Sequence, residues 1–228
     1  MSVAIVTGAA SGMGRACVER FAAEGWQTAG FDLAADGGSA TLDLTVDITD
    51  PAAVAAAVER VVADLGPPKV LVNAAGVYPP STLETATVEL YRRTFDVNVL
   101  GTILVAQAVA PHLVEGSAIV NFASIDAFVP SPGQLVYCAS KAAVVALTRS
   151  LALELAPRVR VNALAPGWVD TPGNRLTGRM EAALASIPLQ RAATSAEIAD
   201  LVWFLSGEGR AAYVTGETLT ATGGSAFR

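Results

Sequence analysis

With 228 residues, 52% of them hydrophobic, the chain has enough apolar side chains for the core of a single domain over residues 1–228. The formal net charge of −6 and the lack of any lysine or arginine cluster argue against a nucleic-acid partner, and two cysteines and one histidine argue against a disulfide scaffold or a metal site. No basic and apolar leader comes first, and charge, glycine or proline interrupts each apolar run, so we expect a cytoplasmic protein without a membrane span.

Short β-rich runs alternate with longer helical patterns along the chain. Strands are expected at residues 3–7, 27–31, 41–47, 70–73, 117–123, 160–165 and 218–221. Helices are expected at 12–24, 51–65, 83–113, 136–155 and 195–205, and Asp50 and Pro51 are typical of the start of the second one. The alternation predicts right-handed βαβ units, and therefore a doubly wound α/β domain whose central parallel sheet is flanked by helices on both faces.

A glycine-rich turn joins the first expected strand to the first expected helix. It reads Thr7-Gly8-Ala9-Ala10-Ser11-Gly12-Met13-Gly14. Glycine lets such a turn bring backbone N–H groups close to a pyrophosphate, and the positive end of the helix dipole adds to the attraction. Similar strings occur by chance in chains rich in glycine and alanine, so it is the strand before and the helix after that indicate a Rossmann-type dinucleotide site.

Two aspartates follow the next two strands. Asp32 ends the second strand, where a carboxylate accepts the ribose hydroxyls of NAD and repels the additional phosphate of NADP. No basic residue stands at Ser11, Leu33 or Ala34 to neutralise that phosphate, so we expect NAD to be preferred over NADP. The alternative is a solvated carboxylate at a strand end. Asp47 could accept the adenine amino group or cap the next helix.

A tyrosine and a lysine stand four residues apart at the start of an expected helix, in Tyr137-Cys138-Ala139-Ser140-Lys141. Side chains at this spacing share one helix face. An ammonium favours the phenolate, so we expect Lys141 to lower the pKa of Tyr137 and to make it an acid/base group. Ser124 directly follows the fifth strand, at the sheet edge where ligands bind, and its hydroxyl could hold a substrate oxygen or cap a turn.

Together these pieces resemble the short-chain dehydrogenase/reductase family over nearly the full length of the chain. The matching pieces, in the order of the family, are the turn from Thr7 to Gly14, Asp32, Asp47, Asn73-Ala74-Ala75-Gly76, Asn98, Ser124, Tyr137 with Lys141, Pro166-Gly167 and Thr171. Each piece alone is a weak signal, but their ordered spacing is a strong one.

The resemblance implies a catalytic set of Asn98, Ser124, Tyr137 and Lys141. Tyr137 would be the general acid in reduction and the general base in oxidation. Lys141 would tune Tyr137 and hold the nicotinamide ribose, Ser124 would orient the substrate oxygen, and Asn98 would hold a water in a proton relay.

The resemblance also implies contacts with the cofactor. Asn73 and the backbone of the following three residues would support it beside the sheet, and Thr171 would reach the nicotinamide carboxamide or a phosphate. The full expected set is Gly8, Ser11, Gly12, Met13, Gly14, Asp32, Leu33, Asp47, Ile48, Asn73, Ala74, Ala75, Gly76, Tyr137, Lys141, Pro166, Gly167, Val169 and Thr171.

Two segments are short for the family. Residues 33–41 are abbreviated, and 172–191, which form a mobile lid in the family, are modest in length, so a small substrate or an open pocket is implied. Candidate pocket residues are Asp126, Phe128, Gln134, Val169 and those near Met180. Asp126 and Gln134 are the substrate contacts that we expect, although Asp126 could simply cap a turn.

The resemblance therefore implies an enzyme that transfers a hydride between NAD(H) and a small secondary alcohol or ketone, without a metal. Family members often form tetramers through the helices near residues 96–113 and 137–155, so we expect a homotetramer or a dimer. Two other functions remain open on this fold, an epimerase or dehydratase that uses NAD transiently and a non-catalytic dinucleotide-binding protein.

Overall fold

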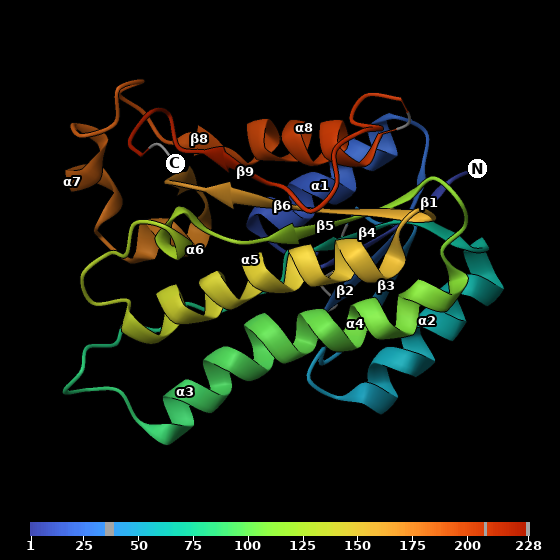
Figure 1. The fold of residues 1–228 in the computed structure, drawn as a ribbon, viewed down its shortest axis with the longest axis horizontal. Coiled ribbons are helices and arrows are strands. Elements are labelled where there is room, and N and C mark those ends of the chain that lie inside the picture. The colour runs from blue at the N-terminus through green and yellow to red at the C-terminus, as the bar shows by residue number, and fades with distance from the viewer. Residues whose placement is uncertain (35–38, 208, 227–228) are drawn as a thin grey trace.

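The central feature of the computed structural model, which describes residues 1–34, 39–207 and 209–226, is a seven-stranded parallel sheet (Figure 1). The strand order is β3-β2-β1-β4-β5-β6-β9. The bounds are β1 Val3–Thr7, β2 Gln27–Asp32, β3 Leu42–Thr45, β4 Pro68–Asn73, β5 Ser117–Phe122, β6 Val159–Pro166 and β9 Thr218–Ala221. The order reverses between β1 and β4, which is the point where ligands bind in doubly wound sheets. The expected fold class is confirmed.

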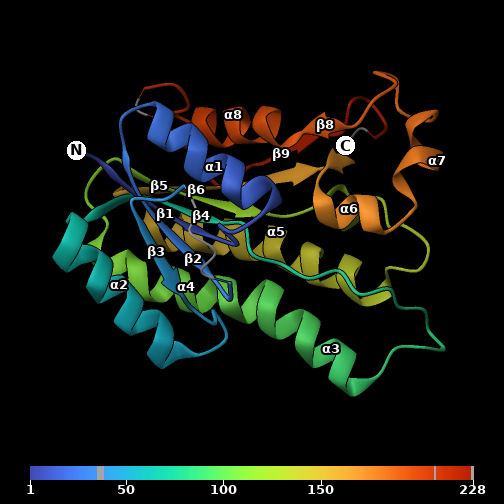
Figure 2. The ribbon, with the colours of Figure 1, turned by 180° about the vertical axis from the view of Figure 1, so that it is seen from behind.

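Helices cover both faces of this sheet (Figures 1 and 2). Helices α1 and α8 lie on one face, and α2, α4 and α5 lie on the other. The bounds are α1 Gly12–Ala23, α2 Pro51–Leu65, α3 Val88–Phe95, α4 Thr102–Val109, α5 Leu135–Leu155, α6 Pro172–Leu176, α7 Met180–Leu184 and α8 Ser195–Ser206. The Asp50 side chain accepts hydrogen bonds from the first turn of α2, so this predicted cap is confirmed.

The two helical layers give the sheet two apolar cores. Under α1 and α8, the buried Phe21 packs against Trp26 and Trp203 at centroid distances of 5.3 and 5.2 Å. The opposite core contains valines of α2 and α4, including the buried Val58 and Val105. Valine-rich strands buried on both faces are typical of a parallel sheet, because helices cover each side of it.

The helix predicted at residues 83–113 is wrong in two respects. It begins only at Val88, with Thr87 as its cap, and a π-helical turn at Asp96–Gly101 separates α3 from α4. The turn contains Asn98, whose side chain bonds to the neighbouring loop, and such irregular turns are frequent at functional sites. By length and composition alone, Val88–His112 and Leu135–Leu155 could each cross a membrane, although both contribute buried residues to the packing around the sheet.

A buried chain of side-chain hydrogen bonds links the ends of two strands to α5. The Asn73 amide donates to Asn121 Oδ1 at 2.9 Å, and the Asn121 amide donates to Thr148 Oγ1 at 3.0 Å. Asn73 and Asn121 are also register partners in the sheet. This polar chain ties β4, β5 and α5 together directly below the edge where ligands are expected.

The chain between β6 and α8 contains elements that the sequence did not predict. A two-stranded pair, β7 Val169–Asp170 with β8 Ala193–Thr194, brackets the short helices α6 and α7. Figure 1 shows these helices at the left, beyond the carboxyl ends of the strands. Of the abbreviated segment at residues 33–41, positions 35–38 lie outside the described residues.

Candidate active site

The glycine-rich turn adopts a conformation that side chains would block. Gly8 and Gly12 have φ values of +68° and +53°, in the left-handed region that favours glycine. A Cβ at Gly14 would overlap the carbonyl oxygen of Gly8, and one at Gly8 would approach the backbone of Ala75 at 2.9 Å. The start of α1 therefore lies close to β1 and to the segment after β4.

Asp32 is tied to the same turn. Its carboxylate accepts hydrogen bonds from the backbone N–H of Ala10 at 3.0 Å and of Ala34 at 3.2 Å. The neighbouring Leu33 is exposed, with 71% of its surface accessible. The structure thus places the Asp32 carboxylate beside the glycine turn, because Ala10, which donates one of these bonds, belongs to the turn.

Asp47 and Ile48 follow β3 with separate local partners. Asp47 accepts bonds from the backbone and the hydroxyl of Thr49 at 2.9 and 2.7 Å, and these bonds hold the pKa of its carboxyl below the usual value. Ile48 is buried, and a Cβ at Gly101 would overlap it. Asp47 therefore ends a turn, while Asp50 caps α2.

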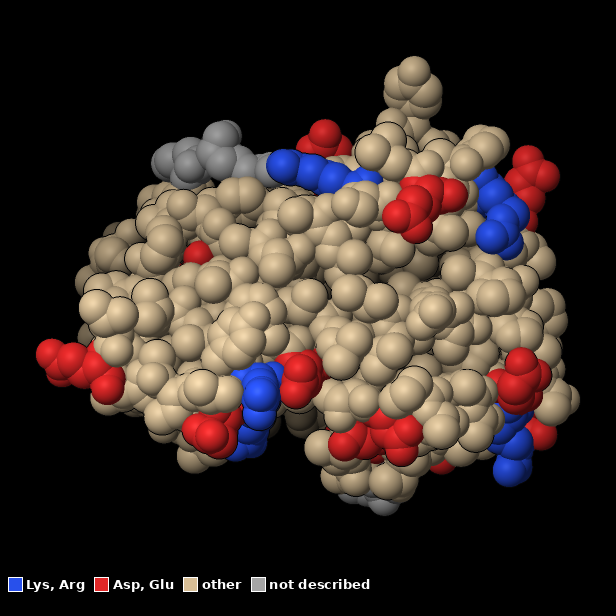
Figure 3. All heavy atoms as spheres, turned by 60° about the horizontal axis from the view of Figure 1, so that its bottom comes forward, with Lys and Arg blue, Asp and Glu red and all other residues tan. Residues whose placement is uncertain are grey.

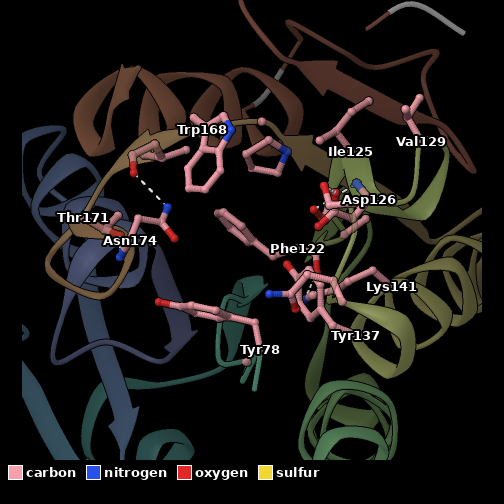
Figure 4. Close-up of a pocket in the computed structure, with 18 of the residues that line it drawn as sticks. Tyr78, Phe122, Ile125, Asp126, Val129, Tyr137, Lys141, Trp168, Thr171 and Asn174 are labelled. Carbon is pink, nitrogen blue, oxygen red and sulfur yellow. Dashed lines mark hydrogen bonds between the residues drawn. The ribbon is translucent and has the colours of Figure 1, made fainter. Parts of the chain in front are cut away.

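A cavity of about 330 Å³ opens at the carboxyl edge of the strands (Figure 4). It lies between the α5 side of the site and the segment that follows β6. The residues that line it are Met13, Ala74, Gly76, Tyr78, Phe122, Ala123, Ser124, Ile125, Asp126, Val129, Ser131, Gln134, Tyr137, Lys141, Pro166, Gly167, Trp168, Val169, Thr171, Asn174, Thr177, Arg179, Ser186, Ser225 and Ala226.

Ser124, Tyr137 and Lys141 all line this cavity, as the sequence predicts. Tyr137 and Lys141 lie in the first two turns of α5, with the Lys141 ammonium 5.8 Å from the centroid of the Tyr137 ring. The ammonium donates a hydrogen bond to the Phe122 carbonyl at the end of β5, at 2.7 Å. Ser124 accepts from the Asp126 backbone N–H at 3.1 Å, so it also caps the short helical turn that follows it.

The acid/base properties of this pair differ from the expectation. Burial raises the pKa of the Tyr137 phenol, and the hydrogen bond with Ser124 opposes this only in part. Burial lowers the pKa of Lys141 to about 8. The Tyr137 pKa is therefore raised in this structure and not lowered as predicted, because loss of solvation is the largest influence on it. Tyr137 is a protonated phenol at neutral pH.

Asn98 lies behind the pair, in the π-helical turn. Its Oδ1 accepts the Val77 N–H at 2.8 Å, and its Nδ2 donates to the Val77 carbonyl at 2.9 Å and to Ser140 Oγ at 3.0 Å. A Cβ at Gly76 would lie 3.2 Å from Asn98 Oδ1 and 3.4 Å from Lys141 Nζ. Asn98 thus fixes the loop after β4 against α5, and Gly76 lets that loop approach the ammonium.

The expected substrate contacts Asp126 and Gln134 both line the cavity, and so does Val169. Of the residues near Met180, Thr177 and Arg179 line it, as expected. Phe128 does not line it among the described residues, and this expectation is wrong because a short helical turn directs Phe128 toward the apolar cluster of Val144.

Several further lining residues were not expected from the sequence, and three of them, Tyr78, Trp168 and Asn174, carry polar or aromatic groups into the cavity wall. Asn174 donates to the Val169 carbonyl at 2.8 Å, and its backbone N–H bonds to the capping hydroxyl of Thr171. The Arg179 guanidinium lies 5.9 Å from the centroid of the Trp168 ring. Of these residues, only Tyr78 could have been singled out from the sequence, because it lies two residues after the Asn73–Gly76 segment, which follows an expected strand.

Tyr78 lies between Tyr137 and the segment of residues 171–187, which we call the lid segment. Its ring meets that of Tyr137 edge to face at 6.1 Å, and Figure 4 shows its hydroxyl directed toward the side of Thr171 and Asn174. A Cβ at Gly173 would overlap this hydroxyl, whereas it would lie 3.4 Å from the ring carbon that bears it. The hydroxyl of Tyr78 therefore occupies the space that only a glycine leaves at position 173.

This fit predicts a compensating pair of substitutions. We expect Gly173→Ala to raise KM about 10-fold or more, because overpacking costs roughly 1–3 kcal/mol and displaces Tyr78 or α6. Gly173→Ala combined with Tyr78→Phe should recover most of this loss, since the phenylalanine lacks the overlapping oxygen. Steady-state kinetics of the two single variants and the double variant measure the coupling. Additive effects would contradict the contact.

The edge of the sheet fits a dinucleotide. The left-handed glycines leave a cradle at the start of a 12-residue helix, and Asp32 adds a carboxylate acceptor at one end of it. At the other end, Thr171 approaches Gly12: the Thr171 methyl carbon would lie 3.4 Å from a Cβ added to Gly12. The cradle therefore leads from Asp32 past Thr171 to the cavity that contains Tyr137.

Comparisons with known proteins agree with this geometry. A family model for enoyl-(acyl carrier protein) reductase matches residues 8–226. The 2-(R)-hydroxypropyl-CoM dehydrogenase of Xanthobacter autotrophicus is 38% identical over 97% of this chain and 97% of its own length.

Two solved structures are similar over the whole fold. A short-chain dehydrogenase/reductase from Brucella melitensis, described as a glucose/ribitol dehydrogenase, shares 31% identity over 100% of this chain and 97% of its own, with a TM-score of 0.94. A blue fluorescent protein from a metagenomic library, in complex with NADPH, shares 34% identity over 99% and 98% of the two chains, with a TM-score of 0.92. The chain belongs to the short-chain dehydrogenase/reductase family.

Proposed function

We propose that the protein is an NAD(H)-dependent oxidoreductase that interconverts a small secondary alcohol and the corresponding ketone. The observation that carries this proposal is the convergence of Ser124, Tyr137 and Lys141 on one cavity at the end of the glycine cradle. A panel of secondary alcohols and ketones, each assayed with NAD(H) and NADP(H) by nicotinamide absorbance, tests it. Net cofactor turnover supports a dehydrogenase, and its absence with tightly retained cofactor would favour an epimerase or dehydratase.

The residues divide the chemistry between them. The bound nicotinamide supplies or accepts the hydride. Tyr137 is protonated at neutral pH and donates its proton to the carbonyl oxygen in reduction, and Ser124 holds that oxygen beside it. In oxidation, the phenolate that accepts the alcohol proton is favoured by the Lys141 ammonium, which is 5.8 Å from the ring centroid.

We assign positioning roles to Asn98 and Gly76. Asn98 holds the loop after β4 through two bonds to Val77, and a proton relay through a water at Asn98 would run toward Lys141. Because Lys141 is buried and its pKa is about 8, it gives up or takes a proton near neutral pH. This supports a lysine that both holds the cofactor ribose and passes protons to bulk water.

The preference for NAD rests on Asp32, which faces the glycine turn. Replacing it by serine, Asp32→Ser, should lower the NAD-to-NADP ratio of kcat/KM by about 10- to 100-fold, because a hydrogen bond to a charged group contributes roughly 1.5–3 kcal/mol. The measurement is initial rates with each cofactor at subsaturating concentration. Asp64→Ser, on the exposed side of α2, is the matched control and should leave the ratio unchanged. Equal ratios in both variants would refute the assignment.

We also propose a cytoplasmic homo-oligomer. Leu153 on α5 and Leu100 and Ile103 near the start of α4 are exposed, at 83%, 41% and 37%. Figure 3 shows that the side of the molecule where α3 and α4 lie is largely uncharged, with acidic and basic side chains toward its margins. A second copy packed on these helices would bury this apolar surface, as a dimer or a tetramer.

A further inference from the structure

One polar atom on the wall of the candidate active site is buried without a partner. The Gln134 side chain is 6% exposed, and its Oε1 has no hydrogen bond within the part of the chain that the structure describes. Buried acceptors are nearly always satisfied, and each exception calls for an explanation. Since Gln134 lines the cavity, a molecule that enters the cavity can satisfy it.

The backbone around Gln134 is firmly held, so the amide has a defined position. Ser81 pairs with this segment: its N–H donates to the Gly133 carbonyl at 2.8 Å, its carbonyl accepts from Leu135 at 3.0 Å, and its hydroxyl accepts from Val136 at 3.1 Å. Gln134 is the N-cap residue of α5, yet its side chain does not cap the helix. The amide is therefore placed by the loop of Ser81 and left available to the cavity.

Gln134 is close to the reacting atoms. It precedes Tyr137 by three residues at the start of α5, and both side chains line the same cavity. A substrate whose carbonyl oxygen bonds to Tyr137 and Ser124 thus presents the adjoining one or two carbon atoms to Gln134. The unpartnered acceptor recognises a substituent next to the reaction centre.

The charges on the cavity wall favour a neutral substituent. Asp126 and Arg179 both line the cavity, and burial raises the pKa of the Asp126 carboxyl, while the hydrogen bond with Ser131 and the charge of Arg179 oppose this rise. Asp126 uses one oxygen to accept the Ser131 hydroxyl at 2.6 Å. The third charged residue of the wall, Lys141, donates to the Phe122 carbonyl, so the remaining pair of one acid and one base gives neither a cationic nor an anionic substituent a net attraction.

A hydroxyl is the neutral group that fits. It can donate a hydrogen bond to the amide oxygen of Gln134. It can also accept one from the amide nitrogen, so it still satisfies the side chain if the amide is rotated and its oxygen and nitrogen exchange places. We propose that the substrate is a polyhydroxylated alcohol or hydroxyketone. Its second hydroxyl lies one or two carbons from the reacting carbon, and this hydroxyl donates a hydrogen bond to Gln134. This inference rests on the proposed hydride transfer and specifies its substrate.

Matched pairs of probes test it in the complete protein. 2,3-Butanediol is compared with 2-butanol, and 2,4-pentanediol with 2-pentanol, each diol as a mixture of stereoisomers. In oxidation with NAD, at least one diol should exceed its monoalcohol in kcat/KM by about 10- to 100-fold, because a buried acceptor without a partner penalises the monoalcohol. Ratios near one for both pairs would overturn the inference.

Variants of Gln134 locate the effect. Gln134→Met keeps the length of the side chain and removes its acceptor, so the diol-to-monoalcohol ratio should fall toward one. Gln134→Glu retains an acceptor oxygen and should restore most of the ratio, which a purely structural role would not do. Gln27→Leu, at the opposite end of the sheet in β2, is a control that should not change the ratio. A ratio unchanged in Gln134→Met would also overturn the inference.

Binding separates this inference from the proposed function. Titration of each probe into the protein with NADH, followed by cofactor fluorescence, gives a Kd ratio that does not depend on turnover. Tighter binding of a diol without turnover would support recognition by Gln134 and refute hydride transfer to this substrate class. Turnover without discrimination, in rates and in binding, would refute recognition by Gln134 and leave the proposed function intact.

Discussion

Removal of the Tyr137 hydroxyl in Tyr137→Phe should lower kcat by about 10²- to 10⁴-fold, the range that a positioned proton donor contributes. The ring would keep its edge-to-face contact with Tyr78, so the cavity wall should stay in place. The loss should therefore appear in kcat, while the affinity for NADH, measured by fluorescence titration, changes little. Initial rates of ketone reduction and of alcohol oxidation measure both directions.

Tyr213→Phe is the matched control, because this tyrosine is fully exposed and is not among the described residues that line the cavity. It should retain the activity of the unmodified protein. A Tyr137→Phe variant that kept full NADH turnover on a good substrate would show that another group moves the proton, and the assignment of the catalytic set would have to be abandoned.

The second large effect is expected at the glycine turn. In Gly14→Ala, the new Cβ would overlap the Gly8 carbonyl oxygen, which is backbone and cannot rotate away. Overpacking of this kind costs roughly 1–3 kcal/mol, so α1 or the turn must shift, and the affinity for NADH should fall by about 10- to 100-fold or more. Fluorescence titration of the cofactor measures the loss, and thermal unfolding measures its effect on stability.

Gly25→Ala separates crowding from backbone strain. Gly25 has a φ of +78° and no atom within 4 Å of an added Cβ, so an alanine there meets only the conformational penalty of roughly 1–2 kcal/mol. It should lower stability and leave NADH affinity unchanged. If Gly14→Ala bound NADH as well as the unmodified chain, the cradle would not be the dinucleotide site.

Much of this architecture follows from local patterns in the sequence. Valine-rich runs bounded by glycine or aspartate gave the strands of the sheet, and their alternation with helices fixed the edge at which Ser124, Tyr137 and Lys141 meet. Asp32 and Asp50 stand at positions where a strand end and a helix start each require an acceptor, and the structure shows both of them accepting backbone N–H groups.

The remaining features depend on contacts between segments far apart in the sequence. The π-helical turn contains Asn98, whose partners are in another loop and another helix, and no periodicity in residues 83–113 encodes that geometry. The raised pKa of Tyr137 reflects the depth at which the tyrosine lies, which spacing alone does not give. The place of Tyr78 against Gly173 likewise exists only once the lid segment has packed.

The buried chain from Asn73 through Asn121 to Thr148 has an evolutionary consequence. A slip of one residue between β4 and β5 would place the amide of Asn73 on the opposite face of the sheet from that of Asn121 and break the chain, so the register of these two strands resists change. The loop residues 125–133 and 174–187 lie outside this chain of hydrogen bonds, and their side chains can change without breaking it. New substrates can therefore be acquired by altering these loops while the geometry of hydride transfer is inherited intact.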